Sequence, residues 1–181
     1  MIEKFLRYEF KYLLDQSATT AIKRDIGHFM HKDPRATLDG DETYDVLSLY
    51  FDTQRHSNYY QKIDGVKSRT KYRLRTYGVL GLLDAPIFFE EKSRNNNRVA
   101  KIREQVTTQF SHTLTRGMPI PLDQTYGDVV DRFMIENAHH RLSPKVLVGY
   151  TRHPLTSNHD GFFRVTFDSN LYAHHSKSIS T

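Results

Sequence analysis

Apolar and polar residues alternate with a period of two along much of the chain, which is the pattern of β-strands that bury one face. The alternation marks residues 5–14, 44–52, 69–77, 87–94, 99–105, 144–152 and 162–169. In the first segment the apolar face is formed by Leu6, Tyr8, Phe10, Tyr12 and Leu14. The run Asn95–Asn97 predicts a hairpin between two of the strands. We therefore expect a mostly antiparallel sheet.

Helical periodicity marks two stretches between the strands. Asp15 or Ser17 can cap a helix that runs to about Met30, and residues 126–139 carry an apolar stripe with helical spacing. The stripe consists of Val129, Val130, Phe133 and Met134. Residues 55–63 suggest a short helical turn, and residues 31–42 a loop. No repeat or low-complexity linker divides the 181 residues, so we expect one α+β domain over residues 1–181, with a mobile polar tail at residues 172–181.

The segment 69–77 carries the strongest charge pattern. One face of this strand presents Arg69, Lys71, Arg73 and Arg75, and the other presents Thr70, Tyr72, Leu74 and Thr76. Like charges along one face repel, so water or bound anions must compensate this row. In the strand at 44–52, Leu47, Leu49 and Phe51 likewise face away from Ser48, Tyr50 and Asp52.

The polar faces of the other predicted strands are also mainly cationic. Their cations include Arg7, Lys11, Lys92, Arg94, Lys101, Arg103, Arg152 and Arg164, and their carboxylates are Glu9, Asp52, Glu90 and Asp168. A solvated sheet face explains this pattern in many antiparallel proteins. Alternatively, the sheet curls with its charged faces inward and encloses a cationic tunnel that water or a polyanion must fill. Arginine suits phosphate because its planar fork donates two hydrogen bonds, whereas lysine supplies a mobile point charge.

Composition narrows the classes of function. The net charge of +5 favours anionic partners without separating nucleic acid from phosphate compounds. The absence of cysteine excludes disulfides and thiolate metal sites and fits a cytoplasmic location. No apolar stretch is long enough to span a membrane, and no glycine-rich phosphate loop is present. The pairs His139–His140 and His174–His175 lack the spacing of metal ligands.

Seven short motifs together resemble a known family. They are Arg7–Tyr12, Ser48–Asp52, Tyr72–Gly78, Phe89–Lys92, Ala100–Arg103, Tyr150–Arg152 and Phe163–Asp168. In this order, over about Phe5 to Leu171, they resemble the VTC domain. This is the polyphosphate polymerase branch of the triphosphate tunnel enzymes, which also include the CYTH proteins. The resemblance implies an antiparallel β-barrel around a basic tunnel, flanked by helices.

The resemblance also implies an activity and a site. The activity is transfer of the terminal phosphate of ATP onto a polyphosphate chain, with Mn²⁺ or Mg²⁺ as cofactor. The residues implied to contact phosphate are Lys11, Arg73, Arg75, Lys92, Lys101, Arg152 and Arg164, with Arg103 as a weaker match. Glu90 is implied to be a tunnel acid, and the catalytic candidates are Lys11, Arg73, Arg75, Glu90 and Lys92.

One departure from the family pattern leaves other functions open. Members continue beyond the position of Thr181 with a metal-binding glutamate and a further tunnel lysine, so the resemblance implies a barrel that is incomplete at its C-terminus. A partner chain or an oligomer could complete it. A non-catalytic module for polyphosphate or inositol phosphates and a triphosphate hydrolase are therefore alternatives. A single-stranded nucleic-acid binder is less favoured, because the aromatic residues Tyr8, Phe10, Tyr12 and Tyr72 alternate opposite the charges.

Overall fold

Eight β-strands form one antiparallel sheet in the computed structural model, which describes residues 5–7, 9–33, 42–78, 85–96, 98–160 and 163–179. The strands are β1 (Phe5–Arg7), β2 (Met30–Lys32), β3 (Tyr44–Asp52), β4 (Ser68–Tyr77), β5 (Ile87–Asn95), β6 (Arg98–Val106), β7 (Ser143–Ser157) and β8 (Arg164–His175). The helices are α1 (Gln16–Ile26), α2 (Ser57–Ile63), α3 (Thr108–Thr115) and α4 (Asp128–His140). The sheet order is β1-β6-β5-β4-β3-β7-β2, and β8 pairs with β7.

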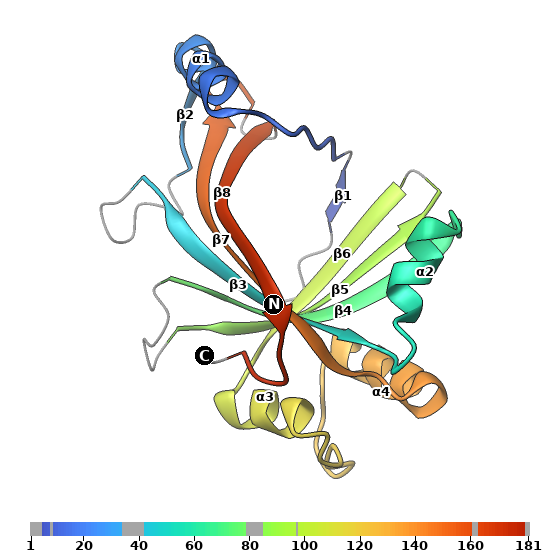
Figure 1. Cartoon of the computed structure of the whole chain (residues 1–181). Helices are drawn as coiled ribbons and strands as arrows, with labels where there is room; N and C mark the ends of the chain where they lie inside the picture. Colours follow the sequence, from blue (N-terminus) through green and yellow to red (C-terminus); the bar gives the residue numbers. More distant parts are fainter. Residues whose placement is uncertain are drawn as a thin grey trace.

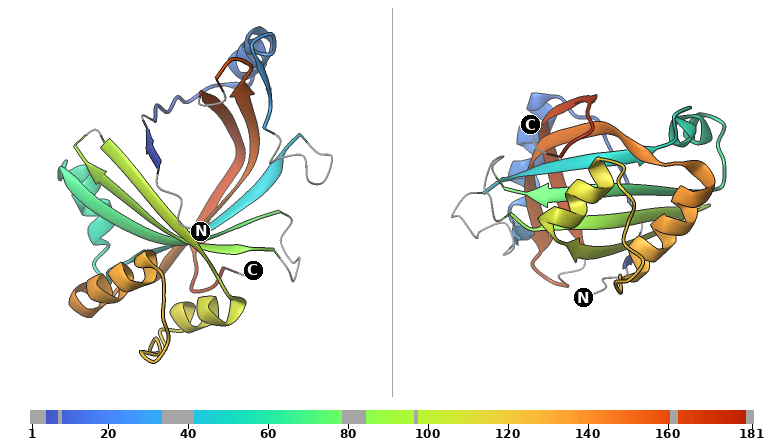
Figure 2. Two further views of the ribbon diagram at one scale, coloured as in Figure 1. Left: turned by 180° about the vertical axis from the view of Figure 1, so that it is seen from behind. Right: turned by 90° about the horizontal axis from the view of Figure 1, so that it is seen from below.

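The sheet curls into an open half-barrel (Figures 1 and 2). Strands β4, β5 and β6 form one arm, and β7 and β8 form the other. We call the face between the arms the concave face and the opposite one the convex face. Helices α3 and α4 lie against the convex face, whereas α1 lies near the far ends of β7 and β8. The predicted α+β fold with a barrel-like antiparallel sheet and flanking helices is confirmed.

The hydrophobic core lies between the convex face and helices α3 and α4. Phe51, Tyr72 and Phe89 of three neighbouring strands pack with Phe133 of α4, and the rings lie mostly edge to face. Leu49 and Leu74 are fully buried between them. Because side chains alternate along each strand, burial of this apolar set directs the charged set to the concave face.

Several predicted elements are confirmed with close boundaries. β4 covers the charged segment and is followed by Gly78, whose positive φ of 95° favours glycine. β5 and β6 form the predicted hairpin, and Asn96 in its turn has a φ of 53°. Asn97 lies outside the described residues. Asp15 caps α1 as predicted, because its carboxylate accepts a 2.7 Å hydrogen bond from the Ala18 amide.

The predicted first strand is wrong over most of its length. β1 ends at Arg7, Tyr8 lies outside the described residues, and residues 9–15 have no regular structure. Arg7 pairs with Val99 near the beginning of β6, so residues 9–15 lie beyond the pairing range of the described part of β6. As a result, Phe10 and Tyr12 are exposed instead of forming an apolar face.

Other boundaries also differ from the predictions. α1 ends at Ile26, and β2 pairs with β7 where a loop was expected. α3 was not predicted. β8 runs on to His175, so that Tyr172–His175 of the expected mobile tail belong to a strand. Most of the predicted loop at residues 31–42 lies outside the described residues. No helix in the described ranges is long and apolar enough to cross a membrane.

Candidate functional site

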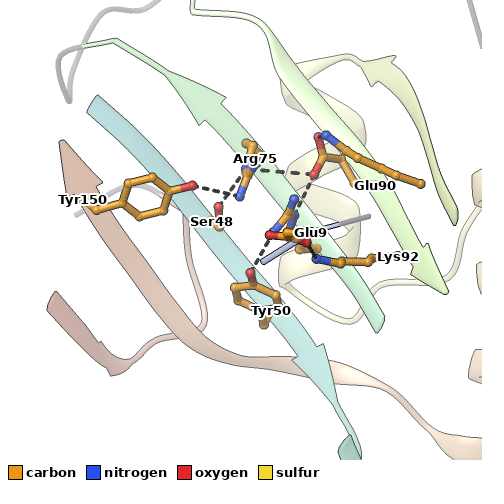
Figure 3. A network of polar contacts seen from close by, with 9 residues as sticks. Glu9, Ser48, Tyr50, Arg75, Glu90, Lys92 and Tyr150 are labelled. Carbon is orange, nitrogen blue, oxygen red and sulfur yellow. Dashed lines mark hydrogen bonds and ion pairs between the residues drawn. The ribbon is translucent and has the colours of Figure 1, made fainter. Parts of the chain in front are cut away.

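Three cations converge on Glu90 at the centre of the concave face (Figure 3). Arg73 of β4 lies directly opposite Glu90 of β5 in the sheet, and its Nε lies 2.6 Å from Glu90 Oε2. Lys101 Nζ reaches the other carboxylate oxygen from β6 at 2.6 Å. Arg75 Nε lies 3.9 Å from Oε2. Each ion pair therefore joins different strands of one arm.

The environment of Glu90 keeps its carboxylate ionised. Its side chain has no exposed surface, and burial alone would raise its pKa, but the charges of Arg73, Arg75 and Lys101 lower it to about 2. Three cations around one carboxylate leave an excess charge of +2. The side chains of Arg73 and Arg75 are only 11% and 7% exposed. The concave face at Glu90 is therefore not an ordinary solvated sheet surface.

Two tyrosines and a serine hold the guanidinium groups in place. Arg73 donates a 2.7 Å hydrogen bond to the hydroxyl of Tyr50, while Arg75 donates to Ser48 Oγ at 2.9 Å and to the hydroxyl of Tyr150 at 3.3 Å. Ser48 and Tyr50 come from β3 and Tyr150 from β7, so the hydrogen bond from Arg75 to Tyr150 links the two arms of the half-barrel across β3 (Figure 3). Ser48, Tyr50 and Tyr150 were not among the site residues predicted from the sequence. Their position opposite Leu47, Leu49 and Phe51 was the signal that could have identified Ser48 and Tyr50.

A row of three lysines lies beside the Glu90 cluster. Lys71, Lys92 and Lys101 are directly opposite one another in β4, β5 and β6. Lys92 Nζ donates a 2.7 Å hydrogen bond to Glu9, which precedes α1. Burial lowers the pKa of Lys101 to about 8, although the adjacent Glu90 acts in the opposite direction. We call Lys71, Lys92 and Lys101 the lysine row.

Of the other predicted site residues, two lie next to this centre. Arg103 is opposite Glu90 in β6, and its guanidinium lies over the ring of Phe88. Arg152 forms a bidentate pair with Asp168 of β8, with both distances at 2.7 Å, and its guanidinium lies 5.0 Å from the centre of the Tyr150 ring. Through Tyr150 it is thus connected to Arg75.

Lys11 and Arg164 are placed differently. The Lys11 side chain is 81% exposed, and its Nζ lies 3.5 Å from Glu9. Arg164 begins β8 and pairs with Asp33 at 3.4 Å. Arg164 pairs in the sheet with Thr156, which follows Tyr150 by six residues along β7. Since Tyr150 is the residue of β7 that contacts Arg75, Arg164 lies away from the Glu90 cluster along the strand. Lys11 and Arg164 are therefore not joined to the Glu90 cluster by direct contacts.

The described carboxylates near the site are not arranged to bind a divalent cation. Within the described ranges, no group of three His, Asp or Glu side chains is arranged to hold a metal ion. The oxygens of Glu90 face Arg73 and Lys101, and those of Asp168 face Arg152. The described residues therefore do not form a protein cradle for Mn²⁺ or Mg²⁺.

Comparisons with known proteins agree with this architecture. The family model described as "VTC domain" matches residues 6–180, which confirms the resemblance seen in the sequence motifs. The crystal structure of a "putative adenylate cyclase" from Bacillus halodurans is similar with a TM-score of 0.52 and 10% sequence identity. This match covers 92% of the present chain and 79% of the other, and at such low identity it concerns the fold alone. No curated protein matches the sequence.

Proposed function

Because the chain belongs to the VTC domain family, we propose that its concave face binds chains of phosphate and transfers the terminal phosphate of ATP onto polyphosphate. The observation that carries the proposal is the excess charge of +2 around the buried Glu90. Cations that are largely withdrawn from water favour a multiply charged anion more strongly than exposed ones do. Phosphate also matches the planar donor fork of arginine.

The proposed reaction needs little covalent help from the protein. A terminal oxygen of the polyphosphate attacks the γ-phosphorus of ATP, the bond from this phosphorus to the β–γ bridging oxygen breaks, and ADP leaves. Phosphoryl transfer of this kind depends mainly on alignment and on neutralising charge. Arg73 and Arg75 would supply both, because Glu90, Tyr50 and Ser48 fix their guanidinium groups. Lys92 and Lys101 would hold neighbouring phosphates.

Roles for the more distant residues and for metal are part of the proposal. Arg103 and Arg152 would bind phosphates beyond the centre, whereas Lys11 and Arg164 would take part at its edges. Dependence on Mn²⁺ or Mg²⁺ is a prediction from the family, and no described residue is assigned to the ion. Loss of ATP turnover on addition of a chelator, with recovery on adding metal, is the measurement that tests this dependence.

A binding module without catalysis is the second candidate. The observation that favours it is the open sheet, because among the described strands β1 and β8 do not pair with each other to close a barrel. A site that is open on one side excludes water poorly, and exclusion of water strengthens the electrostatic interactions on which phosphoryl transfer depends. Water could also replace the phosphate acceptor, which would make the chain a triphosphate hydrolase.

One experiment separates these candidates. The purified chain is incubated with ATP and Mn²⁺, and the products are analysed for long phosphate polymers and for free phosphate. Polymer formation supports the proposed transfer, and free phosphate alone indicates hydrolysis. Thermal stabilisation by tripolyphosphate without turnover indicates binding only, and no interaction at all contradicts a phosphate site.

Variants connect the result to the site. Arg73→Lys keeps the charge but loses the planar fork and its two hydrogen bonds, so we expect polymer formation to fall by about a hundredfold. Arg116→Ala, at an exposed arginine after α3, is the matched control that should remain active. Unchanged synthesis by Arg73→Lys and Arg73→Ala would refute the assignment.

A further inference from the structure

One lysine of the row forms no direct ion pair within the described part of the chain. Like charges that lie directly opposite in neighbouring strands repel. Lys101 pairs with Glu90 and Lys92 with Glu9, but Lys71 has no carboxylate within ion-pair distance among the described residues. The charge of Asp52 acts on Lys71 only from a longer distance. Lys71 is half-buried, so water screens its charge only in part. Within the described ranges, the row therefore lacks a directly paired carboxylate at Lys71.

Glu9 supplies negative charge to this row from outside the sheet (Figure 3). One of its carboxylate oxygens lies 2.7 Å from Lys92 Nζ and the other 3.5 Å from Lys11 Nζ. Burial raises its pKa, but the hydrogen bond from Lys92 and the nearby charges lower it to about 2, so Glu9 is ionised at neutral pH. A carboxylate thus occupies the position in which a phosphate group would meet Lys92.

The segment that carries Glu9 is weakly attached. Residues 9–15 have no regular structure, and the side chains of Phe10, Tyr12 and Leu13 are exposed. Little apolar area would therefore be lost if these residues moved away from the sheet. An external anion can replace Glu9 at Lys92 at a free-energy cost close to that of breaking one partly exposed ion pair.

Building on the proposed function, we infer that the lysine row is a binding track for a phosphate chain and that Glu9 is an internal competitor which the chain displaces from Lys92. Lys71 is then a further phosphate-binding residue, a cation of the row with no directly paired carboxylate among the described residues. The track runs across three strands, a distance of about 10 Å. A chain of several phosphates can contact all three ammonium groups, whereas a single carboxylate contacts only Lys92 and Lys11.

The experiment measures the dissociation constant of tripolyphosphate for wild type, Glu9→Gln and Lys71→Gln by calorimetry at low salt. Glu9→Gln removes the competing charge, so binding should become about fivefold tighter, the factor expected for a partly exposed ion pair. Lys71→Gln removes a binding cation, so binding should become about tenfold weaker. Glu136→Gln is the matched control for Glu9, since the two side chains are 45% and 41% exposed, and Lys177→Gln is the control for Lys71.

The outcomes separate this inference from the function on which it rests. If wild type fails to bind tripolyphosphate, the proposed function itself fails. If wild type binds but Glu9→Gln binds equally or more weakly, Glu9 is not a competitor and the inference is overturned. Binding by Lys71→Gln that equals that of Lys177→Gln overturns the assignment of Lys71. Thermal unfolding without ligand identifies any variant that has lost its fold.

Discussion

Glu90 and Glu91 are consecutive residues of β5, and their carboxylates lie on opposite faces of the sheet in opposite electrostatic environments. Glu90 meets Arg73, Arg75 and Lys101 on the concave face, which lower its pKa to about 2 although burial opposes this. Glu91 lies on the convex face, where burial raises its pKa and Arg132 of α4 approaches to 3.4 Å. The two carboxylates thus belong to consecutive residues, but the negative charge of Glu90 is stabilised by its neighbours and that of Glu91 is disfavoured by burial.

We predict that replacing each glutamate with glutamine has a different effect. The pKa difference between an ordinary glutamate and Glu90 corresponds to about 3 kcal/mol, so Glu90→Gln should lower the free energy of unfolding by about that amount at pH 7. Glu91→Gln removes a carboxylate whose charge is disfavoured and should change stability by less than about 1 kcal/mol. Urea unfolding of the two variants measures the difference.

Ligand binding provides the control for this prediction. Glu90→Gln leaves three cations with no carboxylate between them, so tripolyphosphate should restore more stability to this variant than to Glu91→Gln. Equal destabilisation by the two substitutions would contradict the opposite environments. Equal rescue by tripolyphosphate would contradict phosphate binding next to Glu90.

The charged face of the site follows from local sequence because its signal lies within single strands. In β4 the cations and the core residues Tyr72 and Leu74 alternate, and burial of one set determines where the other set points. The hairpin of β5 and β6 then brings Glu90 and Lys101 to the same face. These relationships need only the period of a strand and the position of a turn.

Other features depend on distant parts of the chain. The alternation at residues 5–14 does not report whether a neighbouring strand exists, so it could not indicate that β1 ends at Arg7 and leaves Lys11 exposed. The contact between Glu9 and Lys92 also arises only after folding. Glu91 lies on the apolar face of β5. The alternation pattern predicts an apolar residue at this position and does not indicate which residue pairs with the carboxylate.

The lowered pKa of Lys101 predicts opposite effects of pH on binding and on stability. Phosphate favours protonated Lys101, so the affinity for tripolyphosphate should fall by about tenfold as pH rises from 7 to above its pKa of about 8. Tripolyphosphate also loses its last terminal proton in this range, but this adds negative charge to the ligand and acts in the opposite direction. Without ligand, the unfolded chain holds the extra proton between about pH 8 and 10.5, so this lysine makes the folded state more stable as pH rises through that window.

Lys101→Arg is the control for the pH prediction, because arginine stays protonated throughout this range. Calorimetry at several pH values should therefore show a smaller pH dependence of binding for Lys101→Arg than for wild type. In buffers of different ionisation enthalpy, wild type should also take up more protons on binding near about pH 8.5 than Lys101→Arg does. Identical pH profiles for the two proteins would assign the dependence to another group.

Gly127 and Glu104 together predict a stability effect at the beginning of α4. Glu104 of β6 accepts a 3.2 Å hydrogen bond from the Val130 amide, and a Cβ atom at Gly127 would lie 1.7 Å from its other carboxylate oxygen. Gly127 has a φ of −87°, which other residues adopt, so the lack of space is the constraint. Gly127→Ala should displace the carboxylate from the helix end and destabilise the fold by about 1–2 kcal/mol in urea unfolding. Because Glu104→Ala removes the clash along with the cap, adding Gly127→Ala to that variant should cost much less, and additive effects of the two substitutions would show that Glu104 does not cap α4.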